Sequence, residues 1–246
     1  MVALCTGAST GIGAECAIAF GERGAHVIVH CNQNRHQAED VAEKVRAARG
    51  QASVVQADLS TRAGIESLIA QLRESGISPD ILVNNAGSLI KRTPVLEFTA
   101  ELWDQVFTLN LTSAFFLTQA VLPGMIAKGR GYVVNVSSVA ARNGGGIGAL
   151  AYAAAKGALS TATKGLAREF AGKGIRVNAV SPGTIETNYH RTFSTPQILD
   201  SVAQATPAGR LGRPREVADL IVFLCSERAT FIQGQVIEIN GGFLMA

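Results

Sequence analysis

The amino-acid sequence predicts an α/β fold, with one doubly wound domain whose seven-stranded parallel sheet carries helices on both faces. Short runs rich in β-branched residues alternate with longer helical stretches almost from end to end. The short runs are apolar along their whole length, which is typical of strands buried on both faces. No linker, repeat or low-complexity tract interrupts this alternation, so residues 1–246 are expected to form a single domain.

The strands are expected, in chain order, at residues 2–6, 26–31, 52–56, 80–84, 131–137, 175–180 and 235–239. The clearest helical patterns lie between them, at residues 38–48, 101–128 and 214–226. Alternating strands and helices imply parallel pairing with right-handed crossovers. Residues 184–213 are polar and less regular, and we expect them to form a mobile lid over a site.

Composition and charge exclude several classes of function. Hydrophobic residues make up 47% of the chain and charged residues 17%, which favours a large core over disorder. The formal net charge is only +3, and the basic residues are scattered, so neither nucleic acid nor a membrane surface is an expected partner. The first strand begins at Val2, no signal peptide is expected, and no apolar run approaches the ~20 residues of a membrane span. We therefore expect a cytoplasmic protein.

The four cysteines indicate buried thiols rather than a disulfide framework or a metal site. Cys5, Cys16, Cys31 and Cys225 form no CxxC pair and have no histidine at ligand spacing. Three of them fall inside strand-like or helix-like runs, where a free cysteine behaves as a small apolar residue.

A glycine-rich turn follows the first strand. The stretch "TGASTGIG", residues 6–13, places Gly7, Gly11 and Gly13 just before a helical pattern. Glycines permit a tight turn and close approach of the backbone, and the helix that follows offers free N–H groups to a phosphate. An ordinary strand-to-helix connection is the alternative. The position after the first strand of a β–α–β unit favours a Rossmann-type dinucleotide site.

The end of the second strand predicts which dinucleotide binds. An NAD site usually has Asp or Glu about 20 residues after the glycines, and this chain has "HCNQNR" at residues 30–35. The absence of a carboxylate permits a 2′-phosphate, which Asn32 and Arg35 could bind. The prediction is NADP(H), with NAD(H) as the alternative, and a solvated loop is the simpler interpretation of these residues.

A phenol and an amine lie four residues apart in "YAAAK", residues 152–156. At helical pitch Tyr152 and Lys156 share a face, so both can point into one pocket. A nearby ammonium favours the phenolate and lowers a pKa that is ordinarily near ~10. Such a pair can exchange a proton with a substrate, although an isolated pair also occurs by chance on a solvated helix.

Five motifs together resemble the classical short-chain dehydrogenases/reductases. "TGASTGIG", "NNAG" (84–87), "NVSS" (135–138), "YAAAK" and "SPG" (181–183) occur in that family's order and spacing. The similarity extends over essentially the whole chain, and five co-linear motifs are more specific than any one of them.

The resemblance implies roles for individual residues. Tyr152 corresponds to the general acid/base, and Lys156 to the residue that lowers its pKa and holds the nicotinamide ribose. Ser138, rather than the adjacent Ser137, corresponds to the hydroxyl that binds the substrate carbonyl, and Asn110 to the asparagine of a water relay. The implied cofactor-binding residues are Gly7, Ser9, Thr10, Gly11, Ile12, Gly13, Asn32, Arg35, Asp58, Leu59, Asn84, Ala86, Gly87, Tyr152, Lys156, Pro182, Gly183, Ile185 and Thr187.

Two departures from the family pattern concern the substrate and the cofactor. Fourteen positions separate Ser138 from Tyr152, one more than is usual, and the extra residue lies near Gly144–Gly146. A longer loop there enlarges the mouth of the substrate site. Thr10 stands where NADP-preferring relatives often carry a basic residue, which weakens the NADP(H) prediction without reversing it.

Two substrate classes remain open. The segment 207–242 resembles 3-oxoacyl-carrier-protein reductases, in which Lys128, Arg130 and Lys173 would dock an acidic acyl carrier protein. The segments 87–94 and 181–191 resemble reductases of sugars and sugar acids. In that case Lys91, Arg92, Arg142, Asn143, His190 and Arg191 would surround a small polar ketone or aldehyde. We expect substrate contacts from Ser138, Tyr152, Arg142, Asn143 and His190, and hydrophobic ketones such as steroids fit least.

A non-catalytic redox sensor is the alternative from another class, because some chains of this fold bind dinucleotide without turnover. Such chains typically lack the tyrosine or the lysine, whereas Asn110, Ser138, Tyr152 and Lys156 are all present here. The resemblance also implies a homo-oligomer, usually a tetramer, packed through the helices that contain Asn110 and Tyr152 and through the last strand.

Overall fold

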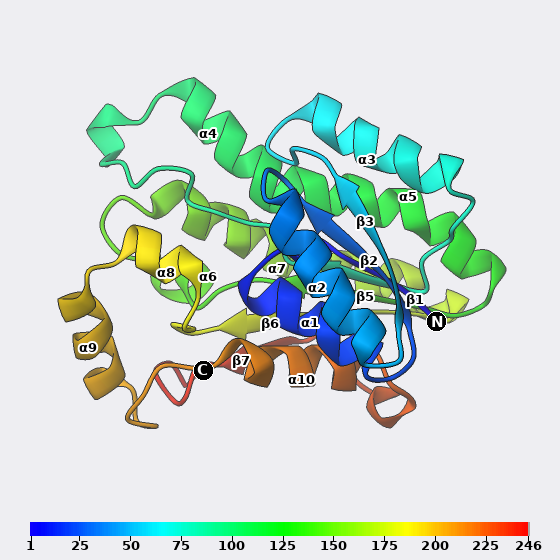
Figure 1. The fold of residues 1–246 in the computed structure, drawn as a ribbon. Coiled ribbons are helices and arrows are strands. Elements are labelled where there is room, and N and C mark those ends of the chain that lie inside the picture. Colours follow the sequence, from blue (N-terminus) through cyan, green and yellow to red (C-terminus); the bar gives the residue numbers. More distant parts are fainter. Residues whose placement is uncertain (246) are drawn as a thin grey trace.

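The computed structural model describes residues 1–245, and of Arg191 its backbone alone. Seven strands form one sheet in the order β3-β2-β1-β4-β5-β6-β7, and every neighbouring pair is parallel (Figure 1). The strands are β1 (Val2–Cys5), β2 (His26–Cys31), β3 (Gln51–Gln56), β4 (Ile81–Asn84), β5 (Gly131–Val136), β6 (Ile175–Pro182) and β7 (Val236–Ile239). The predicted fold class is confirmed, and the first and last residues of each predicted strand agree with the observed bounds to within two residues.

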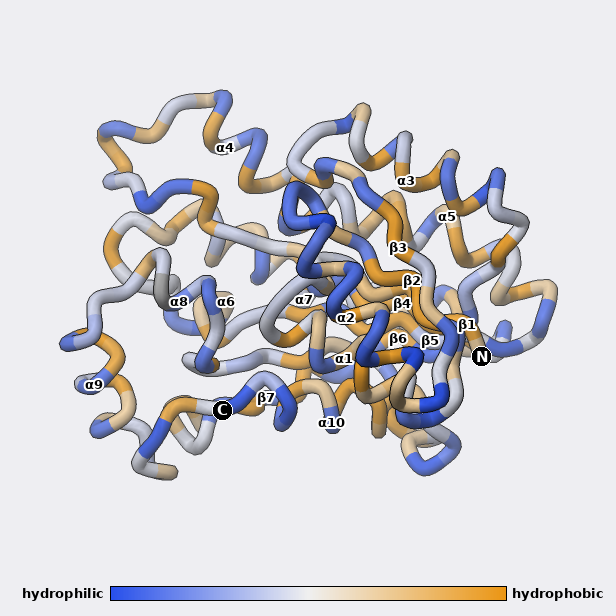
Figure 2. Tube along the Cα trace, in the orientation of Figure 1, coloured by the Kyte–Doolittle hydropathy of each residue, from blue (hydrophilic) through white to orange (hydrophobic). Residues whose placement is uncertain are grey.

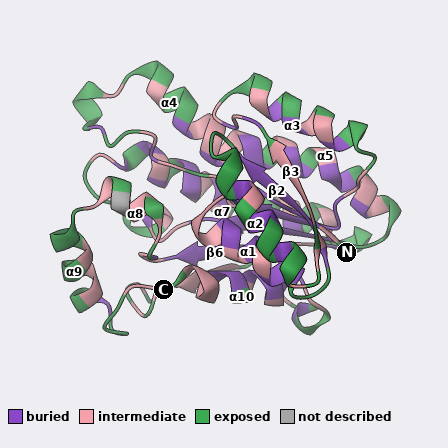
Figure 3. Ribbon diagram, viewed as in Figure 1, coloured by how far each residue is buried: buried purple, intermediate pink, exposed green. Residues whose placement is uncertain are grey.

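The central strands are buried on both faces. In β1, Ala3 and Cys5 pack into one hydrophobic cluster, whereas Leu4 packs into the cluster on the opposite face. Figure 2 shows the resulting band of apolar residues through the sheet, and Figure 3 shows that the same strands are buried. A strand with two buried faces needs apolar residues at every position, which explains the continuous runs in the sequence.

Six long helices cover the two faces. One face carries α1 (Gly11–Gly21), α2 (Arg35–Ala47) and α10 (Pro214–Leu224), and the other α3 (Arg62–Glu74), α5 (Ser113–Ala127) and α7 (Leu150–Phe170). In α3, Ile65, Leu68 and Leu72 recur at helical spacing and are buried. The Thr61 side chain begins this helix by accepting a hydrogen bond from the Gly64 N–H. The shorter helices are α4 (Ala100–Phe107), α6 (Ala140–Asn143), η1 (Val95–Glu97), η3 (Ala171–Lys173) and η4 (Glu227–Ala229).

The predicted long helix at 101–128 is not uniform. Residues 100–107 and 113–127 are α-helical, but Thr108–Thr112 form a π-helical turn, η2, between them. By length and composition alone the run Ala100–Ala127 could cross a membrane, so the expectation that no segment is apolar enough is wrong. In this structure Leu117, Val121 and Met125 of α5 are buried against the sheet. Their apolarity is explained by packing in the core.

Residues 184–213 are more regular than the sequence indicates. They contain α8 (Asn188–Phe193) and α9 (Pro196–Ala205), which lie beyond the carboxyl edge of the sheet (Figure 1). Helix α9 begins with the Thr195 side chain accepting a hydrogen bond from the Ile198 N–H, and with proline in its first turn. The four cysteines are free and buried, as predicted.

The strand order places a crevice at the carboxyl ends of β1 and β4. β1 is followed in sequence by β2 on one side, and β4 pairs with it on the other, so the connections leave in opposite directions. Ligands of open parallel sheets bind at such a switch point.

Candidate active site

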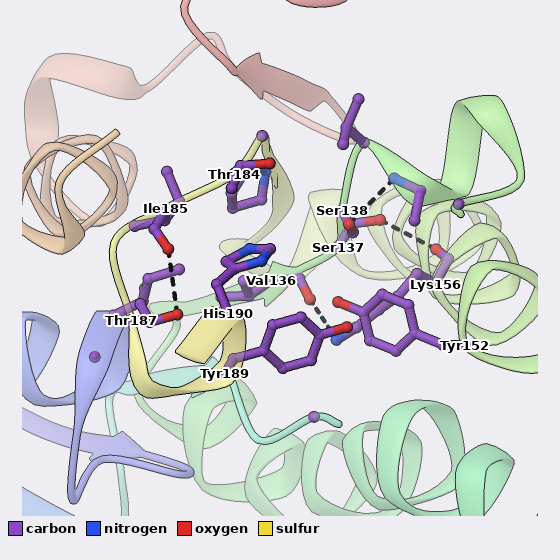
Figure 4. A pocket seen from close by; sticks show the side chains of 18 of the residues that line it. Val136, Ser137, Ser138, Tyr152, Lys156, Thr184, Ile185, Thr187, Tyr189 and His190 are labelled. Carbon is purple, nitrogen blue, oxygen red and sulfur yellow. Dashed lines mark hydrogen bonds between the residues drawn. The ribbon is translucent and has the colours of Figure 1, made fainter. Parts of the chain in front are cut away.

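A cavity of about 530 Å³ opens at this edge of the sheet. It extends from the glycine-rich turn after β1, past the ends of β4, β5 and β6, to α8 (Figure 4). Residues that line it include Gly7, Thr10, Gly11, Ile12, Ala86, Gly87, Ser138, Asn143, Tyr152, Lys156, Pro182, Gly183, Ile185, Thr187 and His190, all of them predicted. Its volume is in the range of small-molecule and cofactor sites.

The glycine-rich turn has room for backbone only. Gly7 and Gly11 have φ of +60°, which side chains rarely adopt. A Cβ on Gly13 would lie 2.5 Å from the Asn85 amide nitrogen and 2.9 Å from the Ala8 Cα. Gly13 was predicted to bind the cofactor, but it does not line the cavity. The absence of a side chain lets the start of α1 pack against the turn instead.

Two side chains that the sequence analysis missed join this turn to the end of β4. The Thr6 hydroxyl accepts hydrogen bonds from the Asn85 and Ala86 N–H groups, at 2.9 and 3.0 Å. The Asn85 amide donates to the carbonyl oxygens of Thr6 and Gly7, at 2.8 and 3.0 Å. These bonds hold the two loops at a fixed separation along the cavity floor.

A buried histidine, also missed, supports the turn from below. His30 Nδ1 accepts a hydrogen bond from the Gly7 N–H at 3.0 Å, and Nε2 lies 3.1 Å from the Ala57 carbonyl oxygen. A carbonyl can only accept, so the Nε2 atom carries the proton. Burial lowers the pKa of His30 to about 4, so the ring is neutral at pH 7.

The start of α1 fits an anionic group. Its first N–H groups have no partner within the helix, and neither a side-chain cap nor an acidic residue occupies this end. The helix dipole adds positive potential at the same point. The cradle formed by the glycines leaves space directly in front of these N–H groups. The residues present thus fit the pyrophosphate of a dinucleotide.

Several residues predicted to bind the adenosine side of the cofactor lie outside the cavity. Asp58 accepts hydrogen bonds from the Ser60 N–H and hydroxyl at 2.9 and 2.7 Å, and Asn32 lies 3.4 Å from the same oxygen. Arg35, the first residue of α2, is exposed and pairs with Glu39 at 3.3 Å. These residues border the open edge of the sheet beyond the cavity, and Ser9 lines a shallow groove beside α2.

Two predicted cofactor residues point elsewhere. The Asn84 side chain donates to Asn135 Oδ1 at 2.9 Å and to the Thr118 hydroxyl at 3.2 Å, within a buried polar network. Leu59 is packed in the hydrophobic core. Both side chains are buried and neither lines the cavity, so a contact of these two residues with a cofactor would come from the backbone.

Tyr152 and Lys156 meet at the inner end of the cavity. Lys156 is almost fully buried, its ammonium lies 5.6 Å from the centre of the Tyr152 ring, and it donates to the Val136 carbonyl oxygen at 2.7 Å. Burial lowers the pKa of Lys156 to about 8. The pKa of Tyr152 is raised, contrary to the sequence expectation, because its burial outweighs the opposite influence of the neighbouring Ser138 and Tyr189 hydroxyl groups.

Adjacent serines have different surroundings. The buried Ser137 hydroxyl bonds to the Ser160 hydroxyl at 2.7 Å and to the Lys156 carbonyl oxygen at 3.1 Å, which ties β5 to α7. The Ser138 hydroxyl accepts a hydrogen bond from the Ala140 N–H and lies beside the Tyr152 phenol. Ser138 thus faces the cavity with its proton available to a ligand.

The π-turn orients Asn110 beneath the cavity. Its amide donates to the Ser88 and Val106 carbonyl oxygens, each at 2.8 Å, and its oxygen accepts from the Ser88 N–H. A Cβ added to Gly87 would lie 2.7 Å from Asn110 Oδ1 and 2.9 Å from Lys156 Nζ. The two polar atoms therefore face the same small volume, which a bridging water could occupy.

The mouth of the cavity is polar. Arg92 reaches it from the loop after β4 and donates to the Ile147 carbonyl oxygen at 2.6 Å, while Asn143 reaches it from the end of α6 and His190 from α8. Burial, together with the Arg92 charge, lowers the pKa of His190. Lys91 is exposed and does not line the cavity, and the Arg191 side chain lies outside the described residues.

Arg142 is not at the mouth. Its Nε atom forms an ion pair with Glu238 of β7 at 3.1 Å, so it joins α6 to the sheet instead of lining the cavity. The predicted substrate contact is wrong, because the short helix turns this side chain away. Tyr189, which was not predicted as a site residue, does line the cavity, and its ring centre lies 5.9 Å from that of Tyr152 (Figure 4).

The three basic residues expected to dock a carrier protein are also misplaced. Lys128 pairs with Asp80 at 2.7 Å, just before β4, Arg130 immediately precedes β5, and Lys173 lies two residues before β6. Parallel strands all begin at one edge of a sheet, whereas the cavity lies at their ends. These residues are therefore at the opposite edge.

Comparisons with known proteins cover almost the whole chain. The family model described as enoyl-(acyl carrier protein) reductase matches residues 7–244. The chain is 40% identical over 247 residues to the uncharacterized oxidoreductase YmfI of Bacillus subtilis, covering 98% of each. It is 38% identical over 244 residues to the 3-oxoacyl-acyl-carrier-protein reductase FabG of Escherichia coli, covering 99% of this chain and 97% of that protein.

Solved structures are similar at the same level. A 3-oxoacyl-acyl-carrier-protein reductase of Brucella melitensis with bound NAD has a TM-score of 0.90 and 36% identity, covering 100% of this chain and 91% of that chain. A 7α-hydroxysteroid dehydrogenase complexed with NADH has a TM-score of 0.90, 35% identity and coverage of 98% and 93%. A candidate gluconate 5-dehydrogenase of Beutenbergia cavernae with bound NADP has a TM-score of 0.90, 33% identity and coverage of 98% and 96%.

Proposed function

The chain belongs to the short-chain dehydrogenase/reductase family, and we propose that it interconverts a small polar ketone or aldehyde and the corresponding alcohol. One observation carries the proposal: Ser138, Tyr152 and Lys156 converge at the inner end of a cavity whose other end is an anion-binding glycine turn. Proton donor, oxyanion-binding hydroxyl and dinucleotide cradle are thus within one ligand's length. The alternative of a non-catalytic sensor leaves this arrangement without a purpose.

Side chains of this protein supply the proton that the reaction needs. A bound nicotinamide supplies or accepts the hydride. In the reducing direction Tyr152 gives its proton to the carbonyl oxygen, while the Ser138 hydroxyl donates a hydrogen bond to the charge that develops there. Lys156, protonated at neutral pH with a pKa of about 8, stabilises the phenolate that remains. Asn110 holds the volume beside Lys156 through which a water can return the proton.

We propose NADP(H) as the preferred cofactor, with NAD(H) as the alternative. The loop after β2 carries no carboxylate at residues 31–35, and Asn32 and Arg35 are exposed at this edge. A 2′-phosphate would meet an amide and a guanidinium there, and would compete for them with the Asp58 and Glu39 carboxylates. Relatives with bound NAD and with bound NADP are both known, so the family alone does not decide.

The polar mouth supports a small hydroxylated or carboxylated substrate. Arg92, Asn143 and His190 offer a cation, an amide and an imidazole around the opening. A carboxylate or several hydroxyl groups would pair with them, whereas a steroid would leave them desolvated and unpaired. We also propose that residues 184–213 act as a lid, because α8 supplies the outer wall and would cover a bound substrate.

The test follows oxidation of NADPH, and then of NADH, by absorbance against four carbonyl compounds. The panel contains a 2-keto-3-deoxy sugar acid, a simple aldose, an acetoacetyl thioester and a hydrophobic diketone. Turnover of the sugar acid, reduced at least tenfold by Arg92→Gln and unchanged by Arg142→Gln, would support the proposal. The control is matched because Arg142 pairs with Glu238 outside the cavity. Silence with every compound, despite tight cofactor binding, would favour the sensor.

The second candidate is a 3-oxoacyl-carrier-protein reductase. It is favoured by the relatives of that name, at 36–38% identity over nearly the whole chain. Preference for the acetoacetyl thioester would support it, and would make the longer loop at Gly144–Gly146 incidental to the substrate.

We propose that the protein is a homo-oligomer of four subunits. Exposed apolar side chains on the outer helices support this proposal. Trp103 of α4, Phe115 of α5 and Leu150 of α7 are 38%, 45% and 49% exposed, and an aromatic stack joins Trp103 to Phe107. Large exposed apolar residues on neighbouring helices are typical of subunit interfaces. Mass measurement by light scattering would test the number of subunits, and a monomer would contradict the proposal.

A further inference from the structure

We propose that Tyr189 is a positioning residue for the proton transfer: its hydroxyl donates a hydrogen bond to the phenol oxygen of Tyr152 and stabilises the phenolate form. The inference rests on the proposed function, because it assigns a second phenol to the same reaction. The chain contains only three tyrosines, and two of them meet at the inner end of the cavity.

The geometry brings the two hydroxyl groups together from separate elements. Tyr152 extends from α7 and Tyr189 from α8, their ring centres are 5.9 Å apart, and their planes are tilted by 36°. In Figure 4 the rings approach from opposite sides, and their oxygens point toward one another. Phe193, one turn along α8, packs 5.1 Å from the Tyr189 ring centre, and the His190 ring packs at 5.0 Å. These contacts hold the Tyr189 ring in place.

The surrounding charges indicate which phenol donates. Lys156 lies on the Tyr152 side, and Arg92 and His190 are the groups that face Tyr189 from the loop and from α8. Burial raises the pKa of both phenols, and the charge of a Tyr152 phenolate further disfavours ionisation of Tyr189, whereas the Lys156 ammonium favours ionisation of Tyr152. Tyr152 is therefore the one that ionises, and the un-ionised Tyr189 hydroxyl is its donor.

The need for this bond follows from the task of Ser138. Reduction adds a hydride from the cofactor to the carbonyl carbon and the Tyr152 proton to the carbonyl oxygen, which leaves a phenolate that solvent later reprotonates. Ser138 also neighbours the phenol, but its hydroxyl is required by the substrate oxygen during this step. Tyr189 then supplies the hydroxyl that remains for the phenolate, beside the ammonium of Lys156.

The test compares Tyr189→Phe with Tyr132→Phe. Tyr132 is a matched control, because its hydroxyl bonds to Glu227 at 2.8 Å, away from the cavity. The measurement is kcat/KM for alcohol oxidation as a function of pH, with cofactor affinity and thermal unfolding of each variant. We expect Tyr189→Phe to move the acid limb of the profile upward by about one pH unit, with a tenfold loss below it and a nearly unchanged plateau. Tyr132→Phe should leave the profile unchanged.

Two results would overturn the inference. An unmoved acid limb would show that Tyr189 does not stabilise the phenolate. A lower KM with an unmoved limb would show that Tyr189 only occupies the position of the substrate. If the unmodified protein turns over no alcohol, the proposed function fails instead. Ultraviolet titration of the Tyr152 phenolate in the cofactor complex, with Tyr152→Phe as the blank, then still decides whether Tyr189→Phe raises its pKa.

Discussion

The two ends of the cavity are built differently. At the cofactor end, Thr6, His30 and Asn85 tie the glycine-rich turn to neighbouring loops, and the Thr6 and His30 side chains are 1% and 2% exposed. At the substrate end, α6, α8 and the loop around Ile147 are short and largely solvated, with the Ile147 side chain 89% exposed. The first region has little freedom to accept a changed side chain, and the second has much.

This difference teaches how one fold serves several reactions. The relatives with similar structures include an oxoacyl reductase and a hydroxysteroid dehydrogenase, each solved with NAD or NADH. A cofactor site closed by backbone contacts can stay constant, while loops that contact little else change with the substrate. Specific substitutions can break or sharpen this comparison.

The largest effect is expected where the two ends meet. Tyr152→Phe removes the proton donor while keeping the ring, so kcat should fall at least ~100-fold, as loss of a general acid typically causes. Cofactor affinity should be unchanged, since the glycine turn and α1 are untouched. Steady-state rates and cofactor titration check both statements. Turnover within a factor of three of the original rate would contradict the assignment.

The next effect compares a glycine from each end. Gly13→Ala would place its Cβ against Gly7 and Ala8 backbone and against the Asn85 amide, which should cost about 3 kcal/mol of stability. Gly146→Ala should change stability by less than ~0.5 kcal/mol, because its Cβ would meet only the Arg92 side chain, at 3.5 Å. Urea unfolding measures both. Equal losses would mean that the two ends are equally constrained.

A third effect depends on pH and on the cofactor end alone. The pKa of His30 is about 4 in the fold and ordinarily near 6.5, so below pH 6.5 the unfolded chain takes up the proton first. Stability is therefore complete above pH 6.5 and is lost toward pH 4, by about 2 kcal/mol between pH 6.5 and pH 5.

Two variants isolate this contribution in urea unfolding at a series of pH values. His30→Gln keeps an acceptor for Gly7 but does not titrate, and should flatten the decline. His36→Gln, at a side chain that is 92% exposed, should not change it. An unaltered decline in His30→Gln would assign the acid sensitivity to other groups.

The sequence predicted the framework well because the framework follows local rules. Continuous apolar runs, helical spacing and the glycine turn located all seven strands and the nucleotide end of the site. Side-chain direction was harder to predict. Asn84 is the last residue of β4 and Leu59 lies in the loop after β3, and only the contacts of the folded chain decide that both side chains turn into the interior.

Other residues depended on contacts between distant segments. His30 supports Gly7 across 23 positions, and Arg142 reaches Glu238 across 96, which no local pattern reveals. Tyr189 meets Tyr152 only because two short helices form within a stretch that reads as irregular. The π-turn around Asn110 was likewise hidden, because α5 after it is apolar on all sides and carries no one-sided pattern that a shift of one residue could interrupt.

The smallest effect concerns the exposed edge of the cofactor end. Arg35→Gln should weaken NADPH binding about fivefold, which is the scale of a solvated ion pair, and should leave NADH binding unchanged. Arg35 now pairs with Glu39 at 3.3 Å, and a 2′-phosphate would compete for the same guanidinium. Arg46→Gln is the matched control, because Arg46 lies at the far end of the same helix and donates to the Ala52 carbonyl oxygen. Equal weakening of both dinucleotides would mean that Arg35 contacts a group they share. If neither dinucleotide bound more weakly, NAD(H) would be favoured as the cofactor. The tight packing of the glycine-rich turn would then not extend to this exposed edge.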